Sequence, residues 1–165
     1  MAPKFGTSGL RGLVIDLTSD LVSDHVQAFV RACPVGTGLF VGRDLRPSSL
    51  AISGMVTRAA RAMGLAVTDC GTVPTPALAL AAMESGAAAV MITGSHIPTD
   101  RNGLKFYTPV GEITKNQEID ILNALGDPVN GTVGPDIVQN TTAGDVYITR
   151  FVTAYGTSLT GLRIG

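Results

Sequence analysis

Residues 93–106, TGSHIPTDRNGLKF, hold several side chains that could take part in phosphoryl transfer. Ser95 stands between a glycine and a histidine, directly after the apolar run of residues 87–92. A short apolar run closed by turn residues is typical of a buried strand, so Ser95 is predicted to lie where a strand ends. Open α/β sheets bind their ligands at that edge. The segment thus combines a nucleophile, a proton carrier and two cations, which are Ser95, His96, Arg101 and Lys105.

Ser95 alone could simply be a loop serine that caps the backbone. A serine hydrolase would need the elbow G-x-S-x-G, but Thr93 and Ile97 occupy the two glycine positions. A serine that carries phosphate needs cations nearby, because phosphoserine bears a charge of about −1.5 to −2. The basic side chains that could neutralise part of this charge are Lys105, Arg101 and Arg11. The pattern therefore favours a phosphate carrier over a hydrolase.

Two further segments combine glycine with cations. Residues 5–12, FGTSGLRG, could expose backbone N–H groups around Thr7 and Ser8, and Arg11 could hold a phosphate through two hydrogen bonds. A surface turn is the simpler interpretation of that segment. Residues 42–49, GRDLRPSS, run from a strand end into a helix start, where an anion could bind. A structural role is favoured there, with Asp44 paired to Arg43 or Arg46.

The composition excludes several classes of function. A net charge of −1 gives no basic stripe of the kind that nucleic-acid-binding domains show. The longest apolar runs fall far short of the ~20 residues of a membrane span, and residues 1–12 lack a signal-peptide core, so a cytoplasmic protein is expected. His25 is expected to pack, and two histidines without matched ligand spacing predict no zinc site. Cys33 and Cys70 are expected as buried free thiols.

Alternating strand and helix patterns predict an α/β fold. Helices are expected over residues 18–32, 48–63, 75–86, 114–126 and 145–155, beginning at Thr18 or Ser19, Ser48 or Ser49, Thr75, Thr114 and Asp145. Strands are expected over residues 38–42, 65–70, 87–92 and 104–107. Such βαβ units form a mainly parallel sheet with helices on both faces. Residues 159–165, LTGLRIG, resemble the opening of a further strand, so domain boundaries at 1–158 and 159–165 are expected.

Four motifs together resemble the first domain of the α-D-phosphohexomutases, a superfamily that includes phosphomannomutases and phosphoglucomutases. They are FGTSGLRG at 5–12, GRDLRPSS at 42–49, GTVPTPAL at 71–78 and TGSHIPTDRNGLKF at 93–106. The resemblance implies a three-layer α/β/α sandwich with a mixed, mainly parallel sheet. It also implies that further domains of the same polypeptide complete the catalytic cleft, so that the 165 residues alone are expected to be inactive.

The resemblance also implies roles for individual residues. Ser95 would carry the phosphate, which would also bind magnesium, and would exchange it with a hexose phosphate through a hexose 1,6-bisphosphate. His96 and Lys105 would be acid/base or phosphate-contacting groups. Arg11 would also act in catalysis, and Arg11 and Lys105 would bind phosphate together with Thr7 and Ser8. One position departs from the family pattern, because Ile97 stands where asparagine is usual. Phosphomannomutase is the favoured activity. The alternatives are phosphoglucomutase, phosphoglucosamine mutase and a non-catalytic binding relative.

Overall fold

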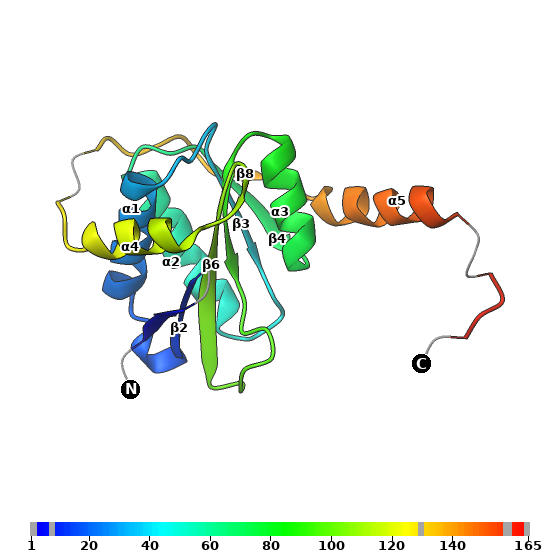
Figure 1. Cartoon of the computed structure of the whole chain (residues 1–165), viewed down its shortest axis with the longest axis horizontal. Helices are drawn as coiled ribbons and strands as arrows, with labels where there is room; N and C mark the ends of the chain where they lie inside the picture. The colour runs from blue at the N-terminus through cyan, green and yellow to red at the C-terminus, as the bar shows by residue number, and fades with distance from the viewer. Residues whose placement is uncertain (1–2, 7–8, 129–130, 157–159, 164–165) are drawn as a thin grey trace.

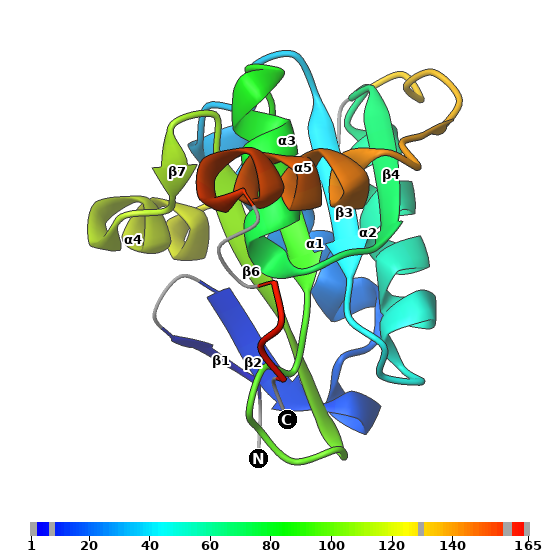
Figure 2. The ribbon, with the colours of Figure 1, turned by 90° about the vertical axis from the view of Figure 1, so that its right-hand side faces the viewer.

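The computed structural model describes residues 3–6, 9–128, 131–156 and 160–163. One mixed sheet separates two layers of helices, as the resemblance implied (Figures 1 and 2). The helices are α1 (Ser19–Ala32), α2 (Ser49–Ala62), α3 (Thr75–Glu84), α4 (Lys115–Asn123) and α5 (Ala143–Tyr155), with a short 3-10 helix at Val14–Asp16. The strands are β1 (Lys4–Gly6), β2 (Gly9–Leu13), β3 (Leu39–Arg43), β4 (Val67–Thr72), β5 (Ala88–Ile92), β6 (Arg101–Thr108), β7 (Gly111–Glu112) and β8 (Val138–Gln139).

The sheet has a parallel centre and an antiparallel flank. Its strand order is β1-β2-β6-β5-β3-β4-β8, and β7 pairs with β6. β3 pairs in parallel with β4 and β5, which confirms the predicted βαβ units. β6 runs antiparallel to β5, and the hairpin of β1 and β2 extends the sheet beyond it. The sequence did not predict this hairpin or β8, because β1 and β2 are short and glycine-containing and β8 has only two residues.

Helix starts agree with the predictions in part. Thr18 caps α1 by accepting a hydrogen bond from the Leu21 N–H, and Thr114 forms the expected capping box with Gln117. Two predicted caps are wrong: α3 begins after Pro74 instead of Thr75, and α5 has Thr142 and not Asp145 at its N-cap. In both, the helix starts earlier than predicted.

The α2 cap was predicted as Ser48 or Ser49, and Ser48 occupies the N-cap position without a side-chain cap hydrogen bond. Its hydroxyl accepts a hydrogen bond from the amide of Asn102 instead, 54 positions away in the sequence. A contact between distant segments has therefore replaced the local cap.

Hydrophobic packing covers both faces of the sheet. On one face α1, α2 and α4 bury a cluster that includes Phe29, Phe106 and Ile121. On the other face α3 and the first turn of α5 pack around Leu78 and Met91. Burying a large apolar side chain contributes about 1.5–3 kcal/mol, so the two clusters stabilise the packing of the helices on the sheet.

The predicted packing role of His25 is confirmed. The His25 side chain is buried and its ring is stacked on that of Phe5, with the centroids 6.0 Å apart. Both free cysteines, Cys33 and Cys70, are buried as expected.

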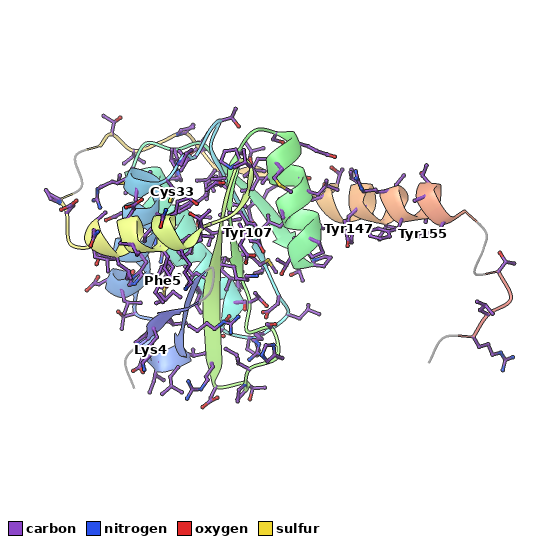
Figure 3. The ribbon with its side chains drawn as sticks, viewed as in Figure 1. Lys4, Phe5, Cys33, Tyr107, Tyr147 and Tyr155 are labelled. Carbon is purple, nitrogen blue, oxygen red and sulfur yellow. The ribbon has the colours of Figure 1, made fainter. Side chains whose placement is uncertain are left out.

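α5 extends away from the sheet (Figure 1). Ala143 is buried and Tyr147 packs against the domain, whereas Tyr155 toward the outer end of the helix is exposed (Figure 3). The described residues contain no helix with the length and hydropathy of a membrane span.

Candidate active site

The Ser95 loop lies at the carboxyl edge of the parallel strands, as predicted. β5 ends at Ile92, whose carbonyl accepts a hydrogen bond from the Asp44 N–H at 2.9 Å. The Thr93 N–H then donates to the carbonyl of Gly103 on β6 at 3.0 Å. β6 returns beside β5, so the sheet fixes both ends of the loop.

Ser95 has a left-handed backbone, with φ of 49°, and its side chain is exposed. Residues other than glycine rarely adopt this conformation, which commonly marks functional sites. The Ser95 N–H donates to Thr93 Oγ1 at 2.9 Å. Ser95 Oγ lies 3.2 Å from Nδ1 of the exposed His96. The nucleophile and the proton carrier predicted from the sequence are therefore in hydrogen-bonding contact.

Asp44 connects the loop to the start of α2. Its Oδ1 accepts hydrogen bonds from the Arg46 N–H at 3.0 Å and from Ser49 Oγ at 2.5 Å, and its Oδ2 accepts one from the Gly94 N–H at 2.9 Å. Burial alone would raise the pKa of Asp44, but the hydrogen bonds from Ser49, Arg46, Gly94 and Thr93 outweigh it and lower the pKa. Asp44 therefore stays ionised at neutral pH.

Arg46 confirms the predicted ion pair and makes a second set of contacts that the sequence did not predict. Its Nε lies 3.5 Å from Asp44 Oδ2. Its Nη1 donates to the carbonyls of Pro98 and Arg101, at 2.6 and 3.0 Å. Its Nη2 donates to the carbonyls of Ile97 and Ser95, at 2.5 and 3.5 Å. One guanidinium therefore binds four backbone carbonyls between residues 95 and 101.

Asn102 is a fully buried polar residue behind the loop. Its side-chain Nδ2 donates to Ser48 Oγ at 2.8 Å and to Ser49 Oγ at 2.9 Å, and its side-chain Oδ1 accepts from the Gly103 N–H. Asn102 thus joins the start of β6 to the start of α2. The two serines and the asparagine stand in separate motifs of the sequence, and only the fold brings them together.

Lys105 and Arg11 share one face of the sheet, at neighbouring strands. Arg11 on β2 is opposite Gly103 on β6, and Lys105 lies two residues further along β6. Residues directly opposite in antiparallel strands point to the same face, and side chains two apart on a strand do so as well. Arg11 is exposed, and a Cβ added to Gly103 would lie 3.0 Å from Arg11 Cγ. The two predicted phosphate-binding cations are therefore near each other.

Lys105 has an acidic partner. Its Nζ lies 2.7 Å from Glu112 Oε1 and 5.8 Å from the centroid of the Tyr107 ring. Burial alone would lower the pKa of Lys105, but the hydrogen bond to Glu112 and the charges of Tyr107 and Glu112 raise it. Within the described part of the chain, no hydrogen bond or ion pair joins Lys105 to Ser95. The structure brings Ser95 and His96 into contact and places Lys105 on the adjacent strand.

The remaining predicted parts of the site are Thr7, Ser8 and a magnesium ion. Thr7 and Ser8 lie outside the described residues, so their predicted phosphate contacts stay predictions. For magnesium, a phosphate on Ser95 would supply an oxygen ligand of the kind that Mg²⁺ prefers. Among the described residues no group of three acidic, histidine or cysteine side chains could complete such a site. The described residues therefore fit a magnesium site to which this domain would contribute one ligand, the phosphate on Ser95.

The comparisons with known proteins agree with this geometry. A family model described as phosphoglucomutase/phosphomannomutase, alpha/beta/alpha domain I, matches residues 2–127. The chain belongs to this family. The family resemblance deduced from the four motifs is thereby confirmed, together with the fold that it implied.

Curated and solved members of the family are longer than this chain. A phosphomannomutase from Sinorhizobium fredii is 44% identical over 100% of this chain and 38% of that protein. A phosphoglucosamine mutase from Thermobifida fusca is 33% identical over 99% of this chain and 39% of that protein. The X-ray structure of a phosphoglucomutase/phosphomannomutase family protein from Burkholderia thailandensis has a TM-score of 0.75 and 30% identity, over 90% of this chain and 35% of that one. The chain spans roughly two fifths of these curated relatives' length.

Proposed function

We propose that this chain is the phosphate-carrying domain of a phosphohexomutase that interconverts hexose 6-phosphates and hexose 1-phosphates, with phosphomannomutase as the favoured activity. The observation that carries the proposal is Ser95 itself. Its exposed hydroxyl stands on a left-handed residue at the carboxyl edge of β5, 3.2 Å from His96 Nδ1. The match of residues 2–127 to domain I of the family supports the same role.

The proposed reaction moves one phosphoryl group in each direction. The bond between Ser95 Oγ and phosphorus breaks as a free hydroxyl of the hexose phosphate attacks, which gives a hexose 1,6-bisphosphate. The hydroxyl proton leaves to a base, and Ser95 Oγ takes up a proton. After the intermediate turns round, Ser95 Oγ loses its proton to a base and attacks the other phosphate. The bond between that phosphorus and the sugar oxygen breaks, the sugar oxygen takes up a proton, and the isomeric hexose phosphate leaves. Such transfers depend mainly on in-line positioning and on neutralising the phosphate oxygens.

The local groups suit separate parts of this task. His96 Nδ1 is within reach of Ser95 Oγ and can hold or return its proton. Lys105 has a raised pKa and remains protonated at neutral pH, which favours contact with phosphate over proton transfer. Arg11 lies on the same face of the sheet and can hold phosphate oxygens through two N–H groups.

Members of the family use magnesium, and the proposed phosphate on Ser95 would be one of its ligands here. When bound, the metal would neutralise developing charge on the transferring group. We assign the remaining ligands and the second phosphate-binding site to further domains of the same polypeptide, which fits the greater length of the relatives. In this proposal residues 1–158 form domain I and residues 159–165 open the next domain.

The choice of sugar rests on the relatives. The 44% identity to a phosphomannomutase favours mannose phosphates, and the 33% identity to a phosphoglucosamine mutase makes glucosamine phosphates the second candidate. The buried free thiols of Cys33 and Cys70 fit a reducing compartment, and we propose a cytoplasmic location.

The full-length polypeptide provides the test of activity. Purified protein is assayed with the 1-phosphates of mannose, glucose and glucosamine, with magnesium and a trace of the matching bisphosphate. The highest kcat/KM is expected with mannose 1-phosphate. Ser95→Ala should abolish turnover, whereas Ser85→Ala, an exposed serine on another loop, should leave it unchanged. Turnover retained in Ser95→Ala, or absent from the wild type with all three sugars, would refute the proposal.

A further inference from the structure

We infer that Arg46 is a positioning residue that holds the Ser95 loop in the conformation presenting Ser95 Oγ for phosphoryl transfer. This inference rests on the proposed function. It goes beyond it, because Arg46 lies in a motif whose simpler interpretation was a salt-bridged turn. The supporting observations are the contacts of its guanidinium, the space beside Gly94 and the backbone of Ser95.

The guanidinium of Arg46 has its N–H groups directed at protein acceptors. Nη1 and Nη2 bind the carbonyls of Ser95, Ile97, Pro98 and Arg101, and Nε faces Asp44. Its side chain is only 16% exposed. A guanidinium has five N–H donors in a fixed plane. Because these contacts engage all three of its nitrogens, Arg46 binds the loop backbone and is not a ligand of the substrate phosphate.

Gly94 provides the space in which the guanidinium sits. Gly94 is buried, and a Cβ at this position would overlap the guanidinium carbon of Arg46. Its backbone φ lies outside the left-handed region, so it does not need glycine for its conformation. Gly94, the residue directly before Ser95, therefore lacks a side chain in the space that the Arg46 guanidinium occupies.

Arg46 and its partner Asp44 together hold the backbone on both sides of the strained residue Ser95. Ser95 is the only described residue other than glycine with a positive φ. A sparsely populated backbone conformation persists where its surroundings over-determine it. Here the Gly94 N–H is held by Asp44, and the carbonyls of residues 95, 97 and 98 are held by Arg46, which itself binds Asp44. With its carbonyls turned toward Arg46, the loop leaves the Ser95 side chain facing solvent.

A pair of variants in the full-length polypeptide tests this role. Arg46→Ala removes the contacts, and Gly94→Ala displaces the guanidinium. A displacement of about 1 Å at a reacting group can cost roughly 10²-fold in rate, so each variant should lower kcat about 10²-fold with KM changed less than about threefold. Because both changes remove the same contacts, the double variant should lose little more than either single one. Arg46→Lys, which keeps the charge without the planar fork, should recover only part of kcat.

Arg61 provides a matched control. Its guanidinium binds the carbonyls of Gly134 and Pro135 and the carboxylate of Asp136, away from the Ser95 loop. Arg61→Ala removes a comparable anchor and should lower thermal stability while leaving kcat unchanged. Equal losses of kcat in Arg61→Ala and Arg46→Ala would show a general loss of stability and overturn the inference. Multiplicative losses in the double variant of Gly94 and Arg46 would overturn it as well.

Hydrogen exchange separates failure of this inference from failure of the proposed function. Arg46→Ala should speed amide exchange of residues 94–101 at least tenfold, and Arg61→Ala should not. Unchanged exchange in Arg46→Ala would overturn the positioning role, whether or not the wild type is active. A wild type without turnover, combined with faster exchange in Arg46→Ala, would refute the proposed function and retain the role of Arg46 in holding the loop.

Discussion

Loss of the Asn102 side chain should weaken the junction between β6 and α2 behind the Ser95 loop. Its amide is fully buried, donates to Ser48 Oγ and Ser49 Oγ, and accepts from the Gly103 N–H. Asn102→Ala removes these three hydrogen bonds and leaves a cavity. A buried group that loses its partner costs about 1–3 kcal/mol. With the cavity included, we expect a loss of about 2–4 kcal/mol in the free energy of unfolding.

Urea unfolding of the 165-residue chain, followed by far-ultraviolet circular dichroism, measures this loss. For a chain of this size each kcal/mol lowers Tm by roughly 2–4 °C, so the melting point should fall by about 4–16 °C. Asn116→Ala is the matched control, because Asn116 is exposed on α4. Its effect should stay within about 0.5 kcal/mol. A result for Asn102→Ala within 0.5 kcal/mol of the control would refute the argument that the buried amide ties the start of β6 to the start of α2.

Asn102→Asp provides a second arm with a distinctive pH dependence. The new carboxylate would be buried and would lack the two N–H donors with which the Asn102 amide binds Ser48 and Ser49. Burial should therefore raise the pKa of this carboxyl above the usual value of about 4. A raised carboxyl pKa makes the folded state bind more protons than the unfolded state, so stability should recover as the pH falls toward and below the raised pKa. If Asn102→Asp lost stability on acidification as steeply as the wild type, the predicted rise in this carboxyl pKa would be wrong.

The cations of the site, the carboxylate of Asp44 and the two buried cysteines can each be tested separately. Lys105→Ala and Arg11→Ala should each lower turnover of the full-length enzyme about 10²–10³-fold with unchanged circular dichroism, and normal turnover in both would contradict the charge role. The lowered pKa of Asp44 contributes stability that is present above the usual carboxyl pKa near 4 and lost as the pH falls further, so urea unfolding of Asp44→Asn should show a smaller acid loss than the wild type. Burial, with smaller effects of nearby carboxylates, raises the pKa of Cys33 and Cys70 to about 11, so native protein should react slowly with a thiol reagent at pH 8, whereas unfolded protein reacts fully.

The parallel centre of the fold could be predicted because its signals are local. Each of β3 and β5 is a short apolar run closed by turn residues, and α1 carries a buried stripe at helical spacing. The direction of β6 could not be predicted, since a strand's side-chain pattern is the same in both directions. The N-caps Pro74 and Thr142 were missed because the sequence offered Thr75 and Asp145 as plausible caps nearby.

The contacts of the site could be predicted where they join sequence neighbours, but not where they join segments far apart in the sequence. Ser95 and His96 are sequence neighbours, and their contact follows from that position. The ion pair of Asp44 and Arg46 was one of two foreseen pairings. The hydrogen bonds from Arg46 to the Ser95 loop join residues about 50 positions apart. No spacing rule reports such a contact. The reason for a glycine at position 94 becomes clear only from the structure, which places the Arg46 guanidinium beside it.

Direct labelling of the protein tests whether Ser95 carries the phosphate. The full-length enzyme is incubated with a hexose 1,6-bisphosphate bearing isotopically labelled phosphate, and the label is located by peptide mass spectrometry. We expect label on Ser95 in the peptide of residues 93–106, and removal of that label when unlabelled hexose phosphate is added. Label on Ser8, Ser48 or Ser49, with none on Ser95, would contradict it.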